Sequence, residues 1–177
     1  LASDFAVLAV KALTVLQTLG YEISEEALRA GLLHTAWKGR FTVINKKPLF
    51  IVDGAHNAGA ADKMAESVRH YFNGKKLIYI MGVFADKEYK IVLEKTAHFA
   101  EKIYTIETPD NPRALPAEEL AKAARVYNSS AESTKSIKDA VEKAFSCAGD
   151  DENSVILAFG SLSFIGALTN AVEEYVG

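Results

Sequence analysis

Cysteine is almost absent from this sequence, and so are several other features that would place the protein in a special class. Its one thiol, Cys147, excludes an internal disulfide framework and is typical of a reducing cytoplasm. The net charge is only −3 and no block of basic residues occurs, which argues against nucleic acid as a partner. The apolar amino-terminal stretch is interrupted by Asp4, Lys11 and Gln17 and lacks a small-residue cleavage pattern. We therefore predict a cytoplasmic protein with no membrane partner.

Two further absences concern the extent of the chain. The sequence has no initiator Met, and a helical pattern is already under way by Asp4, so we expect the 177 residues to be part of a longer protein. No G-x-x-x-x-G-K-S/T phosphate loop occurs in them. The composition, 49% hydrophobic and 24% charged, is that of an ordinary domain that needs neither disulfides nor a structural metal.

The most informative stretch that is present runs from residue 50 to residue 57, Phe-Ile-Val-Asp-Gly-Ala-His-Asn. An apolar, β-branched run there ends in polar residues. An amphipathic helix follows, with apolar residues at helical spacing: Ala61, Met64, Ala65, Val68 and Phe72. Open α/β sheets bind ligands where a buried strand ends just before a helix. Asp53, His56 and Asn57 are therefore the first candidates for a functional site.

Strand and helix patterns alternate along most of the chain. We predict strands at residues 41–44, 49–52, 77–81, 103–106 and 155–159, with a short one near Val126-Tyr127. Helices of ten to fifteen residues between strands favour parallel βαβ units. The predicted fold is α/β, a Rossmann-like, mostly parallel sheet with helices on both faces. A short helical segment precedes it, formed by an apolar helix at residues 6–19 and a second helix capped by Ser24.

Polar or flexible residues follow four of the predicted strands. They occupy residues 53–57, 82–87, 108–113 and 160–161. Because the carboxyl ends of parallel strands share one edge of a sheet, we expect these four loops to converge.

These residues resemble a known family. The sequence is similar to the carboxyl-terminal part of folylpolyglutamate synthase, whose bacterial form often doubles as dihydrofolate synthase, and more widely to the Mur ligases. The resemblance runs from end to end of the chain and rests on Trp37-x-Gly39-Arg40, Asp53-Gly54-Ala55-His56-Asn57, Asp86-Lys87, Asn111-Pro112-Arg113-Ala114-Leu115 and Gly160-Ser161-Leu162.

The resemblance implies a two-step ligase reaction divided between two domains. Residues 37–177 would be the glutamate-ligase domain, and residues 1–36 would belong with an upstream ATPase domain that carries the phosphate loop and the Mg²⁺ ligands. ATP would phosphorylate a folate or dihydropteroate carboxylate, and the amine of L-glutamate would attack the acyl phosphate. The cofactors would be ATP and Mg²⁺, with no metal ligand in this chain, and the chain alone would be inactive.

Two residues match the family's ATP contacts. The resemblance assigns Arg40 to the ATP phosphates, and a planar guanidinium suits bidentate binding of phosphate oxygens. Without the resemblance, we would interpret Arg40 as a partner in a surface ion pair. The resemblance assigns Asp53 to the ribose hydroxyls. Composition alone makes an acid that caps the following turn equally plausible.

Four residues match the family's glutamate region. The resemblance makes His56 the catalytic candidate, lining the glutamate and acyl-phosphate site, although an isolated loop histidine is more often just solvated. It assigns Lys87 and Arg113 to the carboxylate of the incoming glutamate; pairing of Lys87 with Asp86 or Glu88 remains an equal alternative. Ser161 and the N–H groups at the start of a helix would bind a carboxylate, a role compatible with a plain N-cap.

Other classes of function fit less well. A hydrolase built on Ser161 and His56 lacks the G-x-S-x-G elbow, and the two residues occur in the reverse of the α/β-hydrolase order. The four histidines show no metal-ligand spacing. A non-catalytic nucleotide-sensing or interaction domain of flavodoxin-like build stays open, because a fold alone does not give a function. For residues 1–36 without their parent domain, we expect either packing on the α/β core or self-association.

Overall fold

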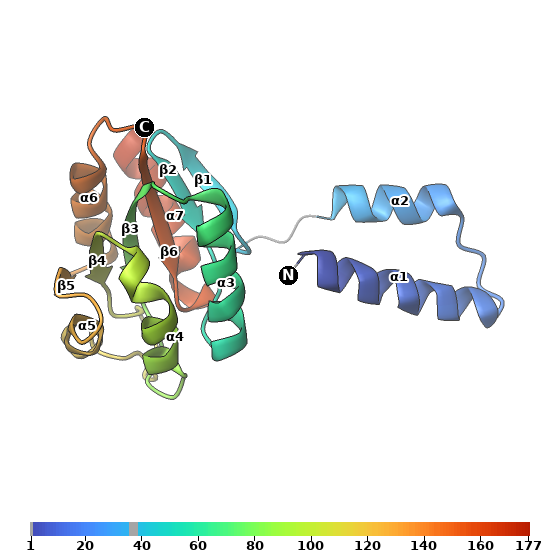
Figure 1. Ribbon diagram of the computed structural model, residues 1–177, viewed down its shortest axis with the longest axis horizontal. Helices are drawn as coiled ribbons and strands as arrows, with labels where there is room; N and C mark the ends of the chain where they lie inside the picture. The colour runs from blue at the N-terminus through green and yellow to red at the C-terminus, as the bar shows by residue number, and fades with distance from the viewer. Residues whose placement is uncertain (1, 36–38) are drawn as a thin grey trace. The chain divides into compact units, whose positions relative to one another are not determined.

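Two helices form the first part of the chain in the computed structural model, which describes residues 2–35 and 39–177 (Figure 1). The chain separates into two units, Leu1–Lys38 and Gly39–Gly177. Trp37 of the Gly-Arg motif and the side chain of Asp4 lie outside the described residues. None of the described helices combines the length and the apolar character that a membrane crossing needs.

The first unit consists of α1 (Ala2–Thr18) and α2 (Glu25–His34). Ser24 caps α2 as predicted, since its hydroxyl accepts a hydrogen bond from the Ala27 N–H at 3.1 Å. No described side chain from residue 5 to residue 35 is buried. Large apolar side chains such as Leu8 and Leu19 are 63% and 69% exposed. The unit by itself therefore does not bury its own apolar surface.

In the second unit, the described strands form one six-stranded sheet in the order β1-β2-β6-β3-β4-β5. The strands are β1 (Thr42–Lys46), β2 (Leu49–Val52), β3 (Lys76–Met81), β4 (Lys102–Thr105), β5 (Ala131–Ser133) and β6 (Ser154–Phe159). Strand β1 pairs antiparallel with β2, and every other pairing is parallel. Strand β6 lies between β2 and β3, with Leu157 opposite both Ile51 and Tyr79.

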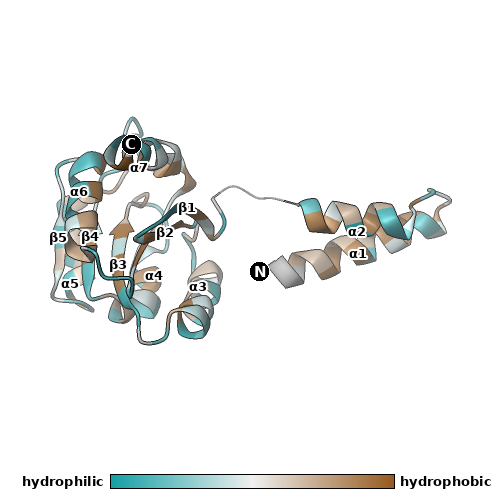
Figure 2. Cartoon of the chain, turned by 90° about the horizontal axis from the view of Figure 1, so that it is seen from above, coloured by the Kyte–Doolittle hydropathy of each residue, from teal (hydrophilic) through white to brown (hydrophobic). Residues whose placement is uncertain are grey.

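Helices cover both faces of this sheet, as Figure 2 shows from above. One face carries α3 (Ala58–Tyr71), α4 (Tyr89–Thr96) and α5 (Ala117–Arg125), and the other carries α6 (Ile137–Ala148) and α7 (Ile165–Val176). Short 3₁₀ turns, η1 (Ala97–Phe99) and η2 (Leu162–Phe164), precede β4 and α7. Ile51 packs on the α3 side, whereas Phe50 and Val52 pack on the α6 side, as the two-residue period of a strand requires. The predicted fold class is confirmed.

Two local predictions were wrong. The short strand expected near Val126-Tyr127 lies instead at Ala131–Ser133: α5 continues to Arg125, and Val126, which caps its end, is 76% exposed. The first strand begins at Thr42 rather than at Phe41 and continues to Lys46. Phe41 has a positive φ of 46°, which is incompatible with a strand.

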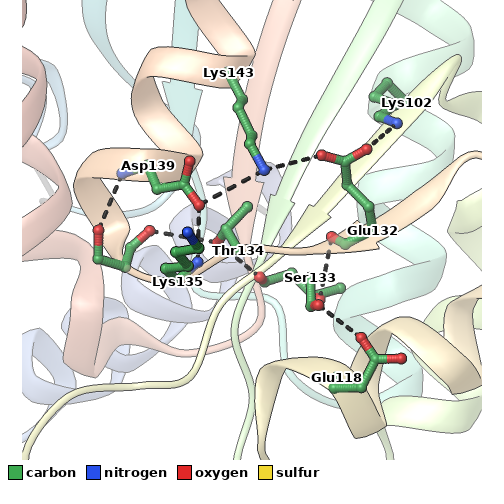
Figure 3. A network of polar contacts seen from close by, with 10 residues as sticks. Lys102, Glu118, Glu132, Ser133, Thr134, Lys135, Asp139 and Lys143 are labelled. Atoms are coloured by element: carbon green, nitrogen blue, oxygen red, sulfur yellow. Dashed lines mark hydrogen bonds and ion pairs between the residues drawn. The ribbon is translucent and has the colours of Figure 1, made fainter.

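Charged side chains protect the edge strand β5 (Figure 3). Glu132 accepts a hydrogen bond from Lys102 at 2.5 Å and forms an ion pair with Lys143 at 3.1 Å. The Lys102 hydrogen bond is the main reason that the pKa of Glu132 lies below its ordinary value. Ser133 donates to Glu118 at 2.6 Å on the neighbouring helix. A short edge strand occupied by such pairs is a poor template for another strand, which disfavours aggregation at this edge.

Candidate functional site

The predicted polar loops follow β2, β6, β3 and β4, which are neighbouring parallel strands. Their carboxyl ends therefore lie at one edge of the sheet, as predicted. The chain leaves β2 for α3 on one face and leaves the adjacent β6 towards α7 on the other face. Adjacent strands that feed helices on opposite faces form a topological switch point, the place where open α/β sheets bind ligands.

Asp53 lies at the end of β2 and is 7% exposed. Its N–H donates to the Ala158 carbonyl at 2.8 Å, and its two carboxylate oxygens accept from the N–H groups of Phe41 and Ala55 at 2.9 and 2.8 Å. Burial raises the pKa of Asp53, and the two backbone hydrogen bonds and the charge of Arg40 oppose that rise. Asp53 thus holds the segment before β1 against the end of β2. Each oxygen keeps a lone pair for a further donor.

Arg40 lies close to this junction. A methyl group added at Gly54 would come within 3.3 Å of Arg40 Nη1 and within 2.6 Å of Leu162 Cδ2. The guanidinium and the Leu162 side chain therefore both lie over Gly54, where any larger residue would displace them. Leu162 also covers Gly39, so one side chain from the end of β6 contacts both the Gly-Arg segment and the loop after β2.

His56 is half-buried, and its ring has one fixed contact. Nδ1 lies 2.8 Å from the carbonyl oxygen of Gly54. Because a carbonyl oxygen only accepts hydrogen bonds, Nδ1 carries the proton, and the neutral ring has its lone pair on Nε2. Nε2 is thus able to take up a proton. Asn57, in contrast, serves the next helix, because its side chain caps α3 by accepting from the Ala60 N–H at 2.9 Å.

Arg113 is paired within the protein. Its Nε and Nη2 donate to the two carboxylate oxygens of Asp86 at 3.2 and 2.6 Å, and its guanidinium lies 4.8 Å from the ring centre of Phe84. The hydrogen bond to Asp86 raises the pKa of Arg113, and the same contact lowers the pKa of Asp86. Lys87 is half-buried next to this pair, and its side chain makes no hydrogen bond or ion pair with any other described residue.

Ser161 follows β6 and is 6% exposed. Its hydroxyl accepts from the Ser163 N–H at 3.2 Å and lies 2.7 Å from the Ser163 hydroxyl, so it caps the turn η2. The structure therefore brings Arg40 and Asp53 together and pairs Arg113 with Asp86. Within the described residues, no hydrogen bond joins His56, Lys87 and Ser161 to one another, which also argues against a Ser-His hydrolase.

Three residues of this edge were not among the predicted site residues. Asp86 holds Arg113, Leu162 covers Gly54, and the Glu88 carboxylate accepts from the Ala58 N–H at 3.1 Å. The sequence offers a signal for the first two, because they belong to the Asp-Lys and Gly-Ser-Leu motifs. It offers none for Glu88, whose partner lies 30 residues away.

Neither a metal-ligand cluster among the described residues nor either of two surface pockets of the second unit adds residues to this edge. Among the residues that the structure describes, no group of three or more His, Cys, Asp or Glu side chains is placed to hold a metal ion. One hollow lies between α6 and α7, beside Val141 and Tyr175. Another lies beside Lys47 and Glu152, which precede β2 and β6 and therefore mark the opposite edge of the sheet.

Proteins named dihydrofolate synthase or folylpolyglutamate synthase are among those with similar sequences and structures. The chain is 32% identical over 151 residues to dihydrofolate synthase/folylpolyglutamate synthase of Bacillus subtilis, covering 85% of this chain and 34% of that protein. Folylpolyglutamate synthase of Thermotoga maritima has a similar structure (TM-score 0.70, 29% identity), with 92% of this chain and 37% of that one covered.

A second solved structure is a bifunctional folylpolyglutamate synthase/dihydrofolate synthase with Mn, AMPPNP and L-glutamate bound. Its TM-score is 0.78 at 26% identity, with 92% of this chain and 38% of that one covered. The chain thus spans about a third of the length of these relatives. Residues 39–162 match the profile of the glutamate ligase domain of Mur ligases, and the chain belongs to this family.

Proposed function

We propose that this chain is the carboxyl-terminal domain of a cytoplasmic, ATP-dependent ligase that adds L-glutamate to folate or dihydropteroate through an acyl phosphate. The observation that carries the proposal is the family match over residues 39–162, the unit in which four loops meet at a topological switch point. The solved relative with AMPPNP, Mn and L-glutamate supports ATP, a divalent metal and glutamate as ligands.

In this proposal, Arg40 and Asp53 bind ATP. The Arg40 guanidinium lies beside Gly54, and its planar fork of donors suits phosphate oxygens, while the Asp53 carboxylate has lone pairs left for ribose hydroxyls. From the family resemblance, we assign the Mg²⁺ ligands and the phosphate loop to an upstream domain; no G-x-x-x-x-G-K-S/T motif occurs in these 177 residues. When bound, Mg²⁺ neutralises charge on the transferred phosphoryl group.

The remaining loops receive glutamate. The Lys87 ammonium attracts a glutamate carboxylate, Arg113 has a further nitrogen beyond the two that bind Asp86, and Ser161 offers a hydroxyl. In the second step the glutamate amine nitrogen bonds to the acyl carbon, and inorganic phosphate leaves with the electrons of the broken C–O bond. The proton released by the amine goes to His56 Nε2 and then to solvent, as general-base catalysis requires.

Release of ADP tests this function. With ATP, Mg²⁺ and a folate or dihydropteroate substrate, the full-length protein should release ADP over repeated turnovers only when glutamate is present, and the 177-residue chain should release none. The chain is expected to be inactive because the reaction needs the missing phosphate loop. Nucleotide binding without turnover in the full-length protein would favour the nucleotide-sensing alternative. Turnover by the chain alone, with contamination excluded, would contradict its assignment as one part of a two-domain site.

The helical unit gives a separate prediction. We propose that residues 1–36 belong with the upstream ATPase domain, which would cover apolar side chains such as Leu8 and Leu19. Each such side chain gains about 1.5–3 kcal/mol on full burial. Without that domain, we expect the chain to self-associate through this segment. Light scattering should show a larger species for the chain than for a version that begins at Thr35; two monomers of equal stability would contradict the proposal.

A further inference from the structure

Glu88 is placed to connect two loops of the site, and its own helix does not use its side chain. It occupies the N-cap position of α4, but its carboxylate makes no hydrogen bond to that helix. Instead the carboxylate accepts from the Ala58 N–H, the first N–H of α3, at 3.1 Å. Helix α3 has no acidic residue in its own first turn. Glu88 therefore supplies the negative charge that a helix amino terminus favours, from a loop 30 residues away.

The hydrogen bond between Glu88 and Ala58 connects the loop after β3 to the loop after β2. Ala58 follows His56 and the N-cap Asn57 directly, so Glu88 is fixed beside the segment that carries the catalytic candidate. Lys87 is the residue next to Glu88. Its position therefore depends on a hydrogen bond that its neighbour makes to the His56 loop.

The other side of the same loop is tied to the loop after β4. Phe84 and Ala114 form an isolated antiparallel bridge, and the Ala85 N–H donates to the Arg113 carbonyl at 2.8 Å. The Asp86–Arg113 pair adds a side-chain contact. Between the Glu88–Ala58 hydrogen bond and these contacts, the Lys87 N–H donates to the Phe84 carbonyl at 3.1 Å and closes a turn.

Lys87 thus lies between two segments that are each held by hydrogen bonds. Its ammonium has no hydrogen-bond or ion-pair partner among the described residues, although its charge is one of the smaller causes that lower the pKa of the neighbouring Asp86. Holding the backbone on both sides fixes the point from which the four-carbon side chain extends, and so limits the region that its ammonium can reach. We propose that Glu88 is a positioning residue, which holds Lys87 between the His56 loop and the Arg113 loop so that its ammonium meets the carboxylate of the incoming glutamate. This inference rests on the proposed function.

A double-mutant cycle in the full-length enzyme tests the inference. Lys87→Met is expected to raise the KM for glutamate about ten- to hundredfold, because a hydrogen bond to a charged group is lost. Glu88→Ala should raise it about tenfold through misplacement of Lys87, with the KM for ATP unchanged. Glu88→Gln should restore a near-normal KM, because the amide oxygen still accepts from the Ala58 N–H. In the double variant, Glu88→Ala should not raise the KM for glutamate beyond its value in Lys87→Met, since Glu88 acts through Lys87.

Glu94→Ala is the matched control, because it removes an exposed acid from the same helix. It should leave the KM for glutamate unchanged, and thermal unfolding should show that all variants fold. The positioning role of Glu88 would be wrong if Glu88→Ala raised the KM for glutamate further in the Lys87→Met background. It would also be wrong if Glu88→Gln raised that KM as much as Glu88→Ala does. Either result would leave the proposed function itself intact. An unchanged glutamate KM in Lys87→Met would overturn the glutamate role of Lys87 itself, and with it the reason for positioning that side chain.

Discussion

Replacing Gly160 by alanine is expected to destabilise the second unit by about 2–6 kcal/mol, from backbone strain and overpacking together. Gly160 has a φ of 115°, a conformation that residues with a side chain rarely adopt. An added methyl group would come within 2.4 Å of the Gly82 carbonyl oxygen and 2.9 Å of Val83 Cγ1. The first of these is backbone at the end of a central strand, so it cannot move aside cheaply. Typical domains are stable by about 5–15 kcal/mol, so this one change would remove a large share.

Denaturant unfolding of the 177-residue chain measures this effect, with Gly166→Ala as the control. Gly166 lies in α7, is exposed, and a methyl group added there would meet nothing within 4 Å. That substitution should be neutral or stabilising by up to about 1 kcal/mol, because alanine favours a helix over glycine. Equal unfolding midpoints for the two variants would show that the ends of β6 and β3 are not packed as closely as the structure places them.

The close contact between Gly160 and Gly82 also matters for the site. It brings the ends of β6 and β3 into backbone contact, so the loops that carry Ser161 and Lys87 begin at neighbouring points. A bulkier residue at either glycine would separate these loops. The spacing of the proposed glutamate site is therefore set by the same packing that stabilises the sheet.

The edge of the sheet that carries the candidate site was predictable because its signals are local. Apolar strands and amphipathic helices alternate along the chain, and parallel strands bring their carboxyl ends together whatever their order. The helix after Asn57 was predicted correctly, since Ala61, Met64 and Val68 are buried. Prediction failed for segments with weak local signals. The sequence Ala131-Glu132-Ser133 has little strand propensity, and it forms a strand only because it pairs with β4.

The partners of the site residues were not predictable for a different reason. Asp53 binds the N–H of Phe41, 12 residues away, and Asp86 binds Arg113, 27 residues away. Such contacts follow from the packed fold and leave no periodic pattern in the sequence. The family resemblance made Asp53 and Arg113 candidates for binding ligands, and in the structure each also stabilises a contact within the protein. For Asp53 these contacts include the cap of the following turn that composition alone made equally plausible, through the Ala55 N–H.

Arg40→Ala is expected to have the largest effect on catalysis in the full-length enzyme. Loss of a charged, preorganised donor typically costs about 10²–10³-fold in rate, so kcat/KM for ATP should fall by about that factor while the KM for glutamate stays nearly unchanged. Arg40→Lys should recover only part of the loss, because lysine keeps the charge but not the planar fork that binds two phosphate oxygens. Steady-state kinetics with ATP and with glutamate as the varied substrate separate the two effects.

The variant must also be separated from a folding defect, because Arg40 has a structural neighbour. Its positive charge lowers the pKa of buried Asp53, opposing the rise that burial causes. Removing that charge makes the ionised carboxylate less favourable, so Arg40→Ala should be somewhat less stable at neutral pH. Arg29→Ala is the control, since Arg29 forms an exposed ion pair with Glu25 in the first unit and should leave ATP kinetics intact. If Arg40→Ala lost stability but kept normal ATP kinetics, Arg40 would serve Asp53 and not the phosphates.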